Sequence, residues 1–146
     1  MLTVLTFNLA IFLGAALLFV IQPMVAQMLL PLFGGSAAVW TICVVTYQAL
    51  LLGGYAYAHV LSKWLRGRRH VVLHVGVLAL AAVVLPIHIA RNLPSAAIST
   101  APVSSLLLLL VPAVALPFVV LAASGPLLQV WFARSRHPSA GDPYFL

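Results

Sequence analysis

Histidine is the residue type in this sequence that is best suited to bind a haem or a metal ion inside a membrane. His59 and His74 lie near the facing ends of two apolar segments, each about one helical turn from the basic residues between them. Matching depths on antiparallel helices would let the two rings act as axial ligands of a b-type haem. Alternatively, both are interfacial histidines that hydrogen-bond to water or lipid headgroups. We favour this second interpretation, and His70 and His88 have no comparable partner.

The remaining chemistry is limited by the near absence of acidic residues. Asp142 is the single acidic residue, so paired-carboxylate catalysis and a serine–histidine–aspartate triad in the membrane are excluded. Cys43 is the single cysteine, which excludes a disulfide framework and a metal site built from several cysteines. Phosphate-binding loops and dinucleotide-binding glycine patterns are absent from the sequence. We therefore assign no catalytic residue and no metal ligand, and we do not expect this chain to be an enzyme by itself.

Four glutamines lie within apolar segments, where an amide side chain needs a hydrogen-bond partner. Gln27 follows Pro23, and Gln129 follows Pro126, by a few residues. Two membrane helices that are each interrupted by a proline near a polar residue can line the central site of a transporter. They are also typical of ordinary proline kinks whose glutamines hydrogen-bond between helices, and we favour that interpretation. The candidate central polar site comprises Gln22, Gln27, Gln48 and Gln129.

The composition shows which elements must carry these side chains. Of 146 residues, 64% are apolar and 5% are charged, whereas a soluble domain has about 25% charged residues. The sequence therefore predicts an all-α integral membrane protein. Its apolar stretches predict about four membrane-spanning helices, the first and fourth kinked by proline. We place the spans at residues 3–30, 37–62, 70–90 and 103–133, which makes residues 1–133 a membrane domain and residues 134–146 a cytoplasmic tail or a link to further helices.

The break between the first two predicted helices lies at residues 30–36. Pro31 disfavours continued helix, and the pair Gly34 and Gly35 permits a sharp turn. Ser36 can then cap the helix that follows. We therefore expect the first helix to end at Leu30.

Positively charged residues mark the ends of the predicted helices. The net charge is +6, and six of the seven cations lie between the second and third spans or just after the fourth. Because short positively charged loops stay in the cytoplasm, we expect both chain ends to be cytoplasmic. The cations form no separate basic face, so we expect contacts with anionic lipid and none with nucleic acid. They are Lys63, Arg66, Arg68, Arg69, Arg134 and Arg136.

Small residues recur four positions apart in the first two predicted helices, a spacing that lets helix backbones approach closely. The second helix also carries several tyrosines and one glutamine, so we expect it to be the central, buried helix. The fold is then held together mainly between the first and second helices. The proposed packing residues are Ala10 and Gly14 in the first helix and Ala49, Gly53, Gly54 and Ala58 in the second.

Several segments are similar to a known family. Residues 22–26, 29–40 and 48–58 read QPMVA, LLPLFGGSAAVW and QALLLGGYAYA, and residues 125–132 and 142–146 read GPLLQVWF and DPYFL. Together they resemble the membrane region of bacterial fused major-facilitator/spermidine-synthase-like proteins. The resemblance implies a multi-pass protein of the bacterial inner membrane, further helices after DPYFL, and a link to polyamines. It transfers no catalytic residue, because the soluble aminopropyltransferase-like domain of such proteins has no counterpart in these 146 residues.

Two functions follow as hypotheses. The first is a non-catalytic, transporter-like membrane module of this family, with the Pro23/Gln27 and Pro126/Gln129 sites lining any central cavity. The second is an accessory transmembrane subunit that scaffolds a larger photosynthetic or respiratory complex. A b-type haem anchor that uses His59 and His74 is a further alternative, although we expect no cofactor. In each case the partners are the lipid bilayer and other membrane subunits or further helices of a longer chain.

Overall fold

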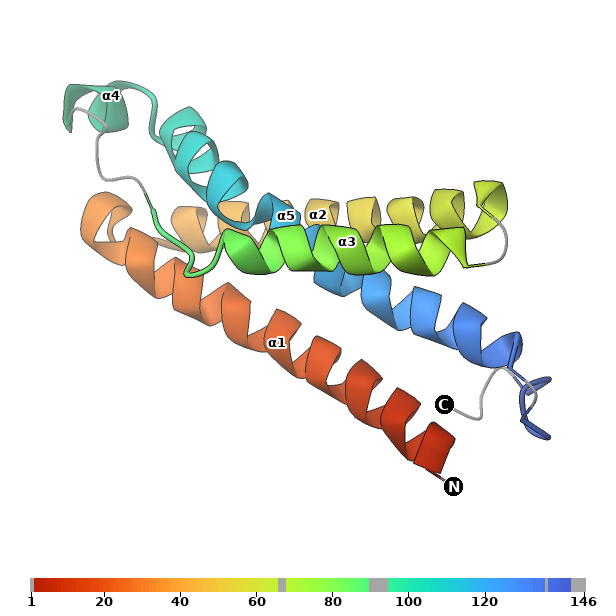
Figure 1. Cartoon of the computed structure of the whole chain (residues 1–146). Coiled ribbons are helices and arrows are strands. Elements are labelled where there is room, and N and C mark those ends of the chain that lie inside the picture. Colours follow the sequence, from red (N-terminus) through yellow and green to blue (C-terminus); the bar gives the residue numbers. More distant parts are fainter. Residues whose placement is uncertain (1, 66–67, 90–94, 136, 143–146) are drawn as a thin grey trace.

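The computed structural model describes residues 2–65, 68–89, 95–135 and 137–142, and the regular structure in these residues is entirely helical (Figure 1). The expectation of an all-α protein is therefore confirmed. The helices of the described residues are α1 (Leu2–Phe33), α2 (Ala37–Trp64), α3 (Arg69–Val83), α4 (Ser95–Thr100) and α5 (Pro102–Ala133).

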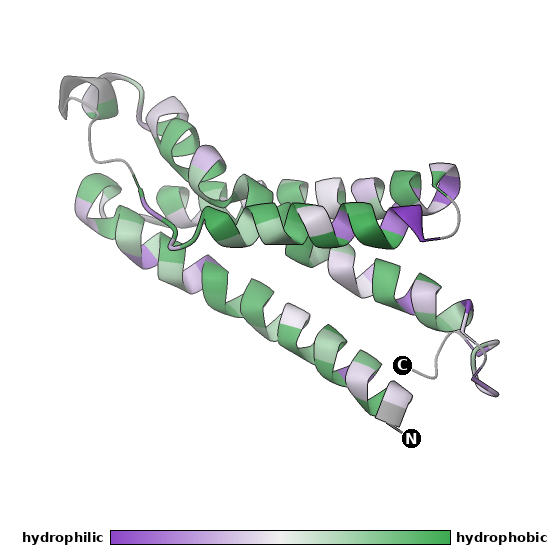
Figure 2. Cartoon of the chain, viewed as in Figure 1, coloured by the Kyte–Doolittle hydropathy of each residue, from purple (hydrophilic) through white to green (hydrophobic). Residues whose placement is uncertain are grey.

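The helices α1, α2 and α5 are long and apolar enough to cross a membrane. Figure 2 shows apolar residues along their whole length, with the most hydrophilic colour where α2 ends and α3 begins. Helices that are apolar all round are typical of membrane spans or of the core of a large protein. The chain is therefore a helical protein with three candidate membrane-spanning helices among its described residues.

A fourth helix of full spanning length is not observed in the described residues. The segment predicted at 70–90 is helical only as α3, which ends at Val83. Its 15 residues extend about 22 Å, short of the roughly 30 Å hydrocarbon core. Pro86 explains the early end, because it has no N–H to donate and disfavours helical conformation in the residue before it. The short α4 falls between the predicted spans 70–90 and 103–133, where no helix was predicted.

The turn between α1 and α2 is set by glycine rather than by proline. Helix α1 runs through Pro31 to Phe33, so the predicted end at Leu30 is wrong by three residues. Gly34 has a positive φ of 73° and donates its N–H to the carbonyl of Leu30 at 2.9 Å, which closes the last turn. Ser36 then caps α2 as predicted, its hydroxyl accepting from the Val39 N–H at 3.3 Å.

The central helix is α5, and the expectation that the second helix occupies this place is wrong. Half of the most apolar stretch of α5 is buried, against 22% for α2 and 6% for α1. Both α1 and α2 contact α5 far more extensively than they contact each other. Within a bilayer, lipid tails are as apolar as leucine, so close van der Waals packing must hold the helices together. The most extensive interhelical contact is that between α2 and α5, followed by that between α1 and α5.

Two clusters of buried side chains lie along α5. In the larger cluster, Tyr47 of α2 stacks on Phe118 of α5 with ring centroids 5.3 Å apart, and Val25 and Leu29 of α1 are fully buried beside them. The smaller cluster joins the second half of α2 to the second half of α5. It comprises Ala58, Leu61, Ala123 and Leu127.

The helix ends that carry basic residues lie at one end of the molecule. The end of α2, the start of α3 and the end of α5 are all on the right in Figure 1, together with the start of α1. Lys63, Arg68, Arg69 and Arg134 belong to these ends, and all four are exposed. Arg66 and Arg136, which complete the predicted set, lie outside the described residues.

Candidate functional site: a histidine and aromatic cluster

Polar and aromatic side chains from α2, α3 and α5 meet near the basic end of the bundle. His70 and His74 are four residues apart on α3, so they lie on the same face of that helix. Both histidines are buried, at 4% and 1% exposed, and their contacts with Ser124 and Trp131 show that this face is turned toward α5. We call the group the histidine cluster. Its members are Tyr57, His70, His74, Ser124 and Trp131.

Ring contacts hold the histidine cluster together. The ring of Trp131 lies with its centroid 5.9 Å from the His70 ring and 6.0 Å from the His74 ring. On the other side, the Tyr57 ring lies 5.9 Å from that of His74. These separations fall within the range of favourable aromatic contacts. Trp131 therefore touches both histidines, and Tyr57 connects them to α2.

The hydrogen bonds of Ser124 are the basis on which we assign a tautomer to His74. The Ser124 hydroxyl donates its single proton to the carbonyl of Val120 at 2.9 Å. Its oxygen lies 3.1 Å from Nε2 of His74, and in that contact it must therefore accept. On this basis we assign the proton of the neutral imidazole ring to Nε2. The lone pair of His74 is left on Nδ1.

Most of the remaining polar atoms of the histidine cluster are buried without a hydrogen-bond partner. In a folded protein such atoms are rare, and a group of them indicates a bound water, ion or ligand. Within the part of the chain that the structure describes, the atoms are the hydroxyl of Tyr57, both ring nitrogens of His70, Nδ1 of His74 and Nε1 of Trp131.

The structure does not bring His59 and His74 together. His59 is exposed and follows Tyr57 by two residues, a rotation of about 200° around a helix. Since Tyr57 contacts His74, His59 points away from it, and it lines a surface pocket with Pro126 and Val130 of α5. This arrangement does not suit a haem held between the two histidines. The neighbour of His74 is His70, and the four-residue spacing of the pair was the signal that sequence reasoning missed.

The four glutamines are not gathered into one site. Gln27, Gln48 and Gln129 are exposed, on α1, α2 and α5 respectively. Gln22 is half-buried, and its backbone carbonyl accepts a hydrogen bond of 3.3 Å from the Tyr47 hydroxyl. The polar contact between α1 and α2 therefore uses a main-chain group of Gln22 and not a glutamine side chain.

Only part of the predicted small-residue strip lies at a helix contact. A Cβ atom on Gly54 would lie 2.6 Å from the Cβ of Ala122 and 2.8 Å from the carbonyl oxygen of Val119. Gly54 therefore sits where the backbones of α2 and α5 cross. Gly14 and Gly53 have no such neighbour within 4 Å. Ala58 is buried in the smaller cluster, Ala10 is half-buried and Ala49 is exposed.

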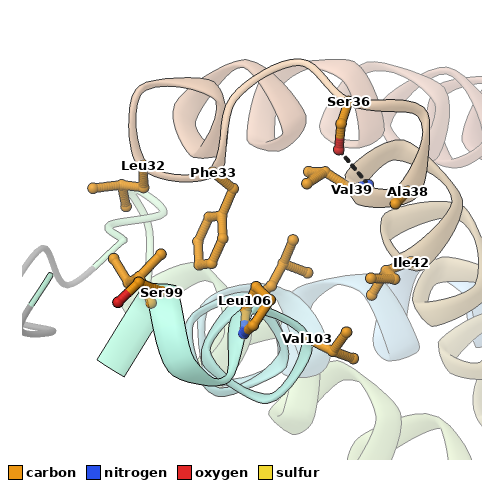
Figure 3. Close-up of a pocket in the computed structure, with 11 residues that line it drawn as sticks. Leu32, Phe33, Ser36, Ala38, Val39, Ile42, Ser99, Val103 and Leu106 are labelled. Atoms are coloured by element: carbon orange, nitrogen blue, oxygen red, sulfur yellow. Dashed lines mark hydrogen bonds between the residues drawn. The ribbon is translucent and has the colours of Figure 1, made fainter. Parts of the chain in front are cut away.

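A separate pocket lies at the opposite end of the bundle. Figure 3 shows it between the end of α1, the start of α2, α4 and the start of α5. Its volume is about 360 Å³, and its lining is mostly apolar, including Phe33, Ile42 and Leu106. The Ser36 hydroxyl at its rim is already engaged in capping α2. The pocket has room for an apolar group but presents no chemistry comparable to that of the histidine cluster.

Comparison with known proteins identifies no relative. No protein-family model matches the chain, no curated protein matches its sequence, and no solved structure matches its fold. The fold and the site define a helical protein with three candidate membrane-spanning helices and a buried histidine cluster among its described residues.

Proposed function

We propose that this chain is a non-catalytic, multi-pass module of the bacterial inner membrane that packs against further transmembrane helices. The observation that carries the proposal is the exposed side chain of Gln48. Gln48 is the twelfth residue of α2, which places it about 17 Å from the start of that helix and thus within a roughly 30 Å hydrocarbon core. An amide group exposed there faces other protein rather than lipid tails, because its polar atoms need partners.

The exposed surface of α1 supports the same proposal. Only 6% of its most apolar stretch is buried, and large side chains such as Phe12 and Phe19 are 67% and 75% exposed. This surface suits lipid or apolar helices. Gln27 lies on the same helix and is also exposed, which favours neighbouring helices over lipid for at least part of the surface.

Four membrane crossings remain our proposal for the topology. Helix α3 and the apolar segment at residues 84–89 together form the third crossing, although α3 alone is too short. The basic helix ends lie together at one end of the bundle, which supports a cytoplasmic location for both chain ends. Their exposed basic residues are Lys63, Arg68, Arg69 and Arg134. Pro23 and Pro126 lie inside α1 and α5 respectively, and we propose that they kink these helices.

The resemblance of the motifs suggests where the further helices come from. We favour a transporter-like module of the spermidine-synthase-like family, in which the neighbouring helices belong to the same polypeptide. The alternative is an accessory subunit of a photosynthetic or respiratory complex, in which they belong to other chains. The weakly buried α1 also suits this alternative, since a subunit needs an apolar helix for contact with its partners.

A photoreactive amino acid at position 48 tests the proposal in the native membrane. We expect the photoreactive side chain that replaces Gln48 to form covalent adducts with protein upon illumination. A matched control carries the same amino acid at Leu80, which is 56% exposed on α3 and apolar. Adducts with lipid alone at position 48 would contradict the proposal.

The mass of the native polypeptide then separates the two alternatives. A mass well above 15.5 kDa, with the cross-link formed inside one chain, would support the family module. A mass of 15.5 kDa, with a cross-link to a second protein, would support the accessory subunit.

A further inference from the structure

We propose that His70 and His74 form a binding site for a divalent first-row transition-metal ion of the Cu²⁺, Ni²⁺ or Zn²⁺ class. The inference concerns the histidine cluster alone and does not depend on what covers Gln48. It rests on the spacing of the two histidines, on the protonation pattern that Ser124 imposes, and on the unpartnered atoms around them.

The spacing of the two histidines matches that of helical metal sites. Side chains four residues apart on a helix have Cβ atoms about 5–6 Å apart, close enough for two imidazoles to bind one ion. The same i, i+4 pair provides two ligands in helical zinc motifs. Both histidines here are more than nine-tenths buried and turned toward α5. A buried pair is also held in few conformations, which favours chelation.

The hydrogen bond to Ser124 prepares His74 for coordination. A metal-binding histidine usually donates the N–H of its other ring nitrogen to a nearby oxygen, which fixes the ring and its tautomer. In the histidine cluster, Nε2 of His74 donates to Ser124, whose own proton is held by Val120. The lone pair on Nδ1 has no donor among the described residues. Nδ1 is therefore the coordinating atom that we assign to His74.

His70 and Tyr57 provide the other ligand atoms. Both ring nitrogens of His70 and the hydroxyl of Tyr57 lack partners within the described part of the chain. Trp131 contacts both histidines but cannot bind a metal, since its indole nitrogen is a donor only. Water would complete the coordination, because the described residues contain no group of three or more His, Cys, Asp or Glu side chains suited to a metal.

The ligand set determines the class of ion. Ca²⁺ and Mg²⁺ require several oxygen ligands, mostly carboxylates and carbonyls, and the histidine cluster contains no carboxylate. Imidazole nitrogen instead suits copper, nickel and zinc, with the highest affinity for Cu²⁺ in this series.

Titration with Cu²⁺ tests the proposal on the full chain, purified in mild detergent without a polyhistidine tag. We expect one ion per chain and an electron paramagnetic resonance spectrum with hyperfine splitting from two imidazole nitrogens. His70→Gln and His74→Gln should each weaken binding at least tenfold. His59→Gln and His88→Gln, which alter exposed histidines, are the matched controls and should bind as the unaltered chain does.

The Ser124→Ala variant tests whether the hydrogen bond to Ser124 orients His74 for metal binding. Without such a role, the two histidines would merely lie close together. Loss of a hydrogen-bond partner of this kind typically weakens metal binding by about 10–100-fold, and we expect a loss in that range. The proposal is overturned if the unaltered protein binds no stoichiometric Cu²⁺, which would indicate a cluster occupied by water. It is equally overturned if the spectrum shows fewer than two nitrogen ligands. Both measurements use the unaltered chain, so a variant that fails to fold does not obscure the result.

Discussion

At the scale of single residues, Gly54 determines how closely α2 and α5 approach. The Gly54→Ala substitution should lower the free energy of unfolding by about 1–3 kcal/mol, because the added methyl group meets Ala122 and a backbone carbonyl at less than 3 Å. The matched control is Gly53→Ala, which adds the same group where no atom lies within 4 Å. This control should be neutral or stabilising, since alanine favours helix over glycine. Unfolding in detergent measures both, and equal stability of the two variants would contradict the close crossing.

Tyr47 makes two separable contacts, one through its ring and one through its hydroxyl. Tyr47→Phe removes only the 3.3 Å hydrogen bond to the Gln22 carbonyl and keeps the stacking on Phe118. We expect a loss of about 0.5–1 kcal/mol in the free energy of unfolding. Tyr55→Phe, at an exposed position of the same helix, should cause no loss. A loss above about 2 kcal/mol would mean that the hydroxyl holds α1 in place.

The histidine cluster shows which parts of a site can be predicted from a membrane sequence. The spacing of His70 and His74 is local, and it places both on one face of α3 whatever the helix packs against. Their contacts with Ser124 and Trp131 depend on how α3 rotates against α5. That rotation is decided by packing over some fifty residues of sequence separation, so periodicity in the sequence does not reveal it.

At the scale of elements, Ser36 fixes the start of α2. Ser36→Ala removes the acceptor for the Val39 N–H and should cost about 1 kcal/mol of stability. Ser36→Asn keeps an acceptor at the same position and should retain most of that stability. Thermal unfolding of both variants in detergent provides the comparison. An alanine variant as stable as the asparagine variant would contradict a role for the cap.

Helix boundaries were predictable where neighbouring residues in the sequence decide them, and not where the surrounding structure does. The cap at Ser36 and the start of α5 near residue 103 follow from the sequence. Pro31 was expected to end α1, yet a proline removes only one backbone hydrogen bond, and the helix continues to Phe33. In contrast to α1, which continues past Pro31, α3 ends at Val83, before Pro86. The residue type alone does not distinguish these two prolines.

At the scale of the whole molecule, the basic helix ends should face one side of the membrane. Single cysteines at Lys63 and Ser135, in a chain with Cys43→Ala, should react with a membrane-impermeant maleimide from the cytoplasmic side. A cysteine at Ser36 should react only from the opposite side. Sealed vesicles of known orientation provide the measurement. Labelling of positions 63 and 135 from different sides would contradict the proposed topology.

The all-α class and the three long helices α1, α2 and α5 were predictable, because composition and the length of apolar stretches decide them. The arrangement of the helices was not. Small residues four apart predicted close packing of α2 with α1, and this partner is wrong, since a glycine face can accept any helix with a complementary surface. Gly54 meets Ala122 of α5 rather than a residue of α1.

The central place of α5 has a consequence for biogenesis. Its residues are synthesised after those of the other four helices, whereas α1 and α2 have little contact with each other. In the proposed membrane topology, the earlier helices would enter the bilayer before the surface that unites them exists. They must remain as separate, individually inserted segments until residues 102–133 leave the ribosome. Assembly of these helices around α5 thus waits until α5 itself has been synthesised.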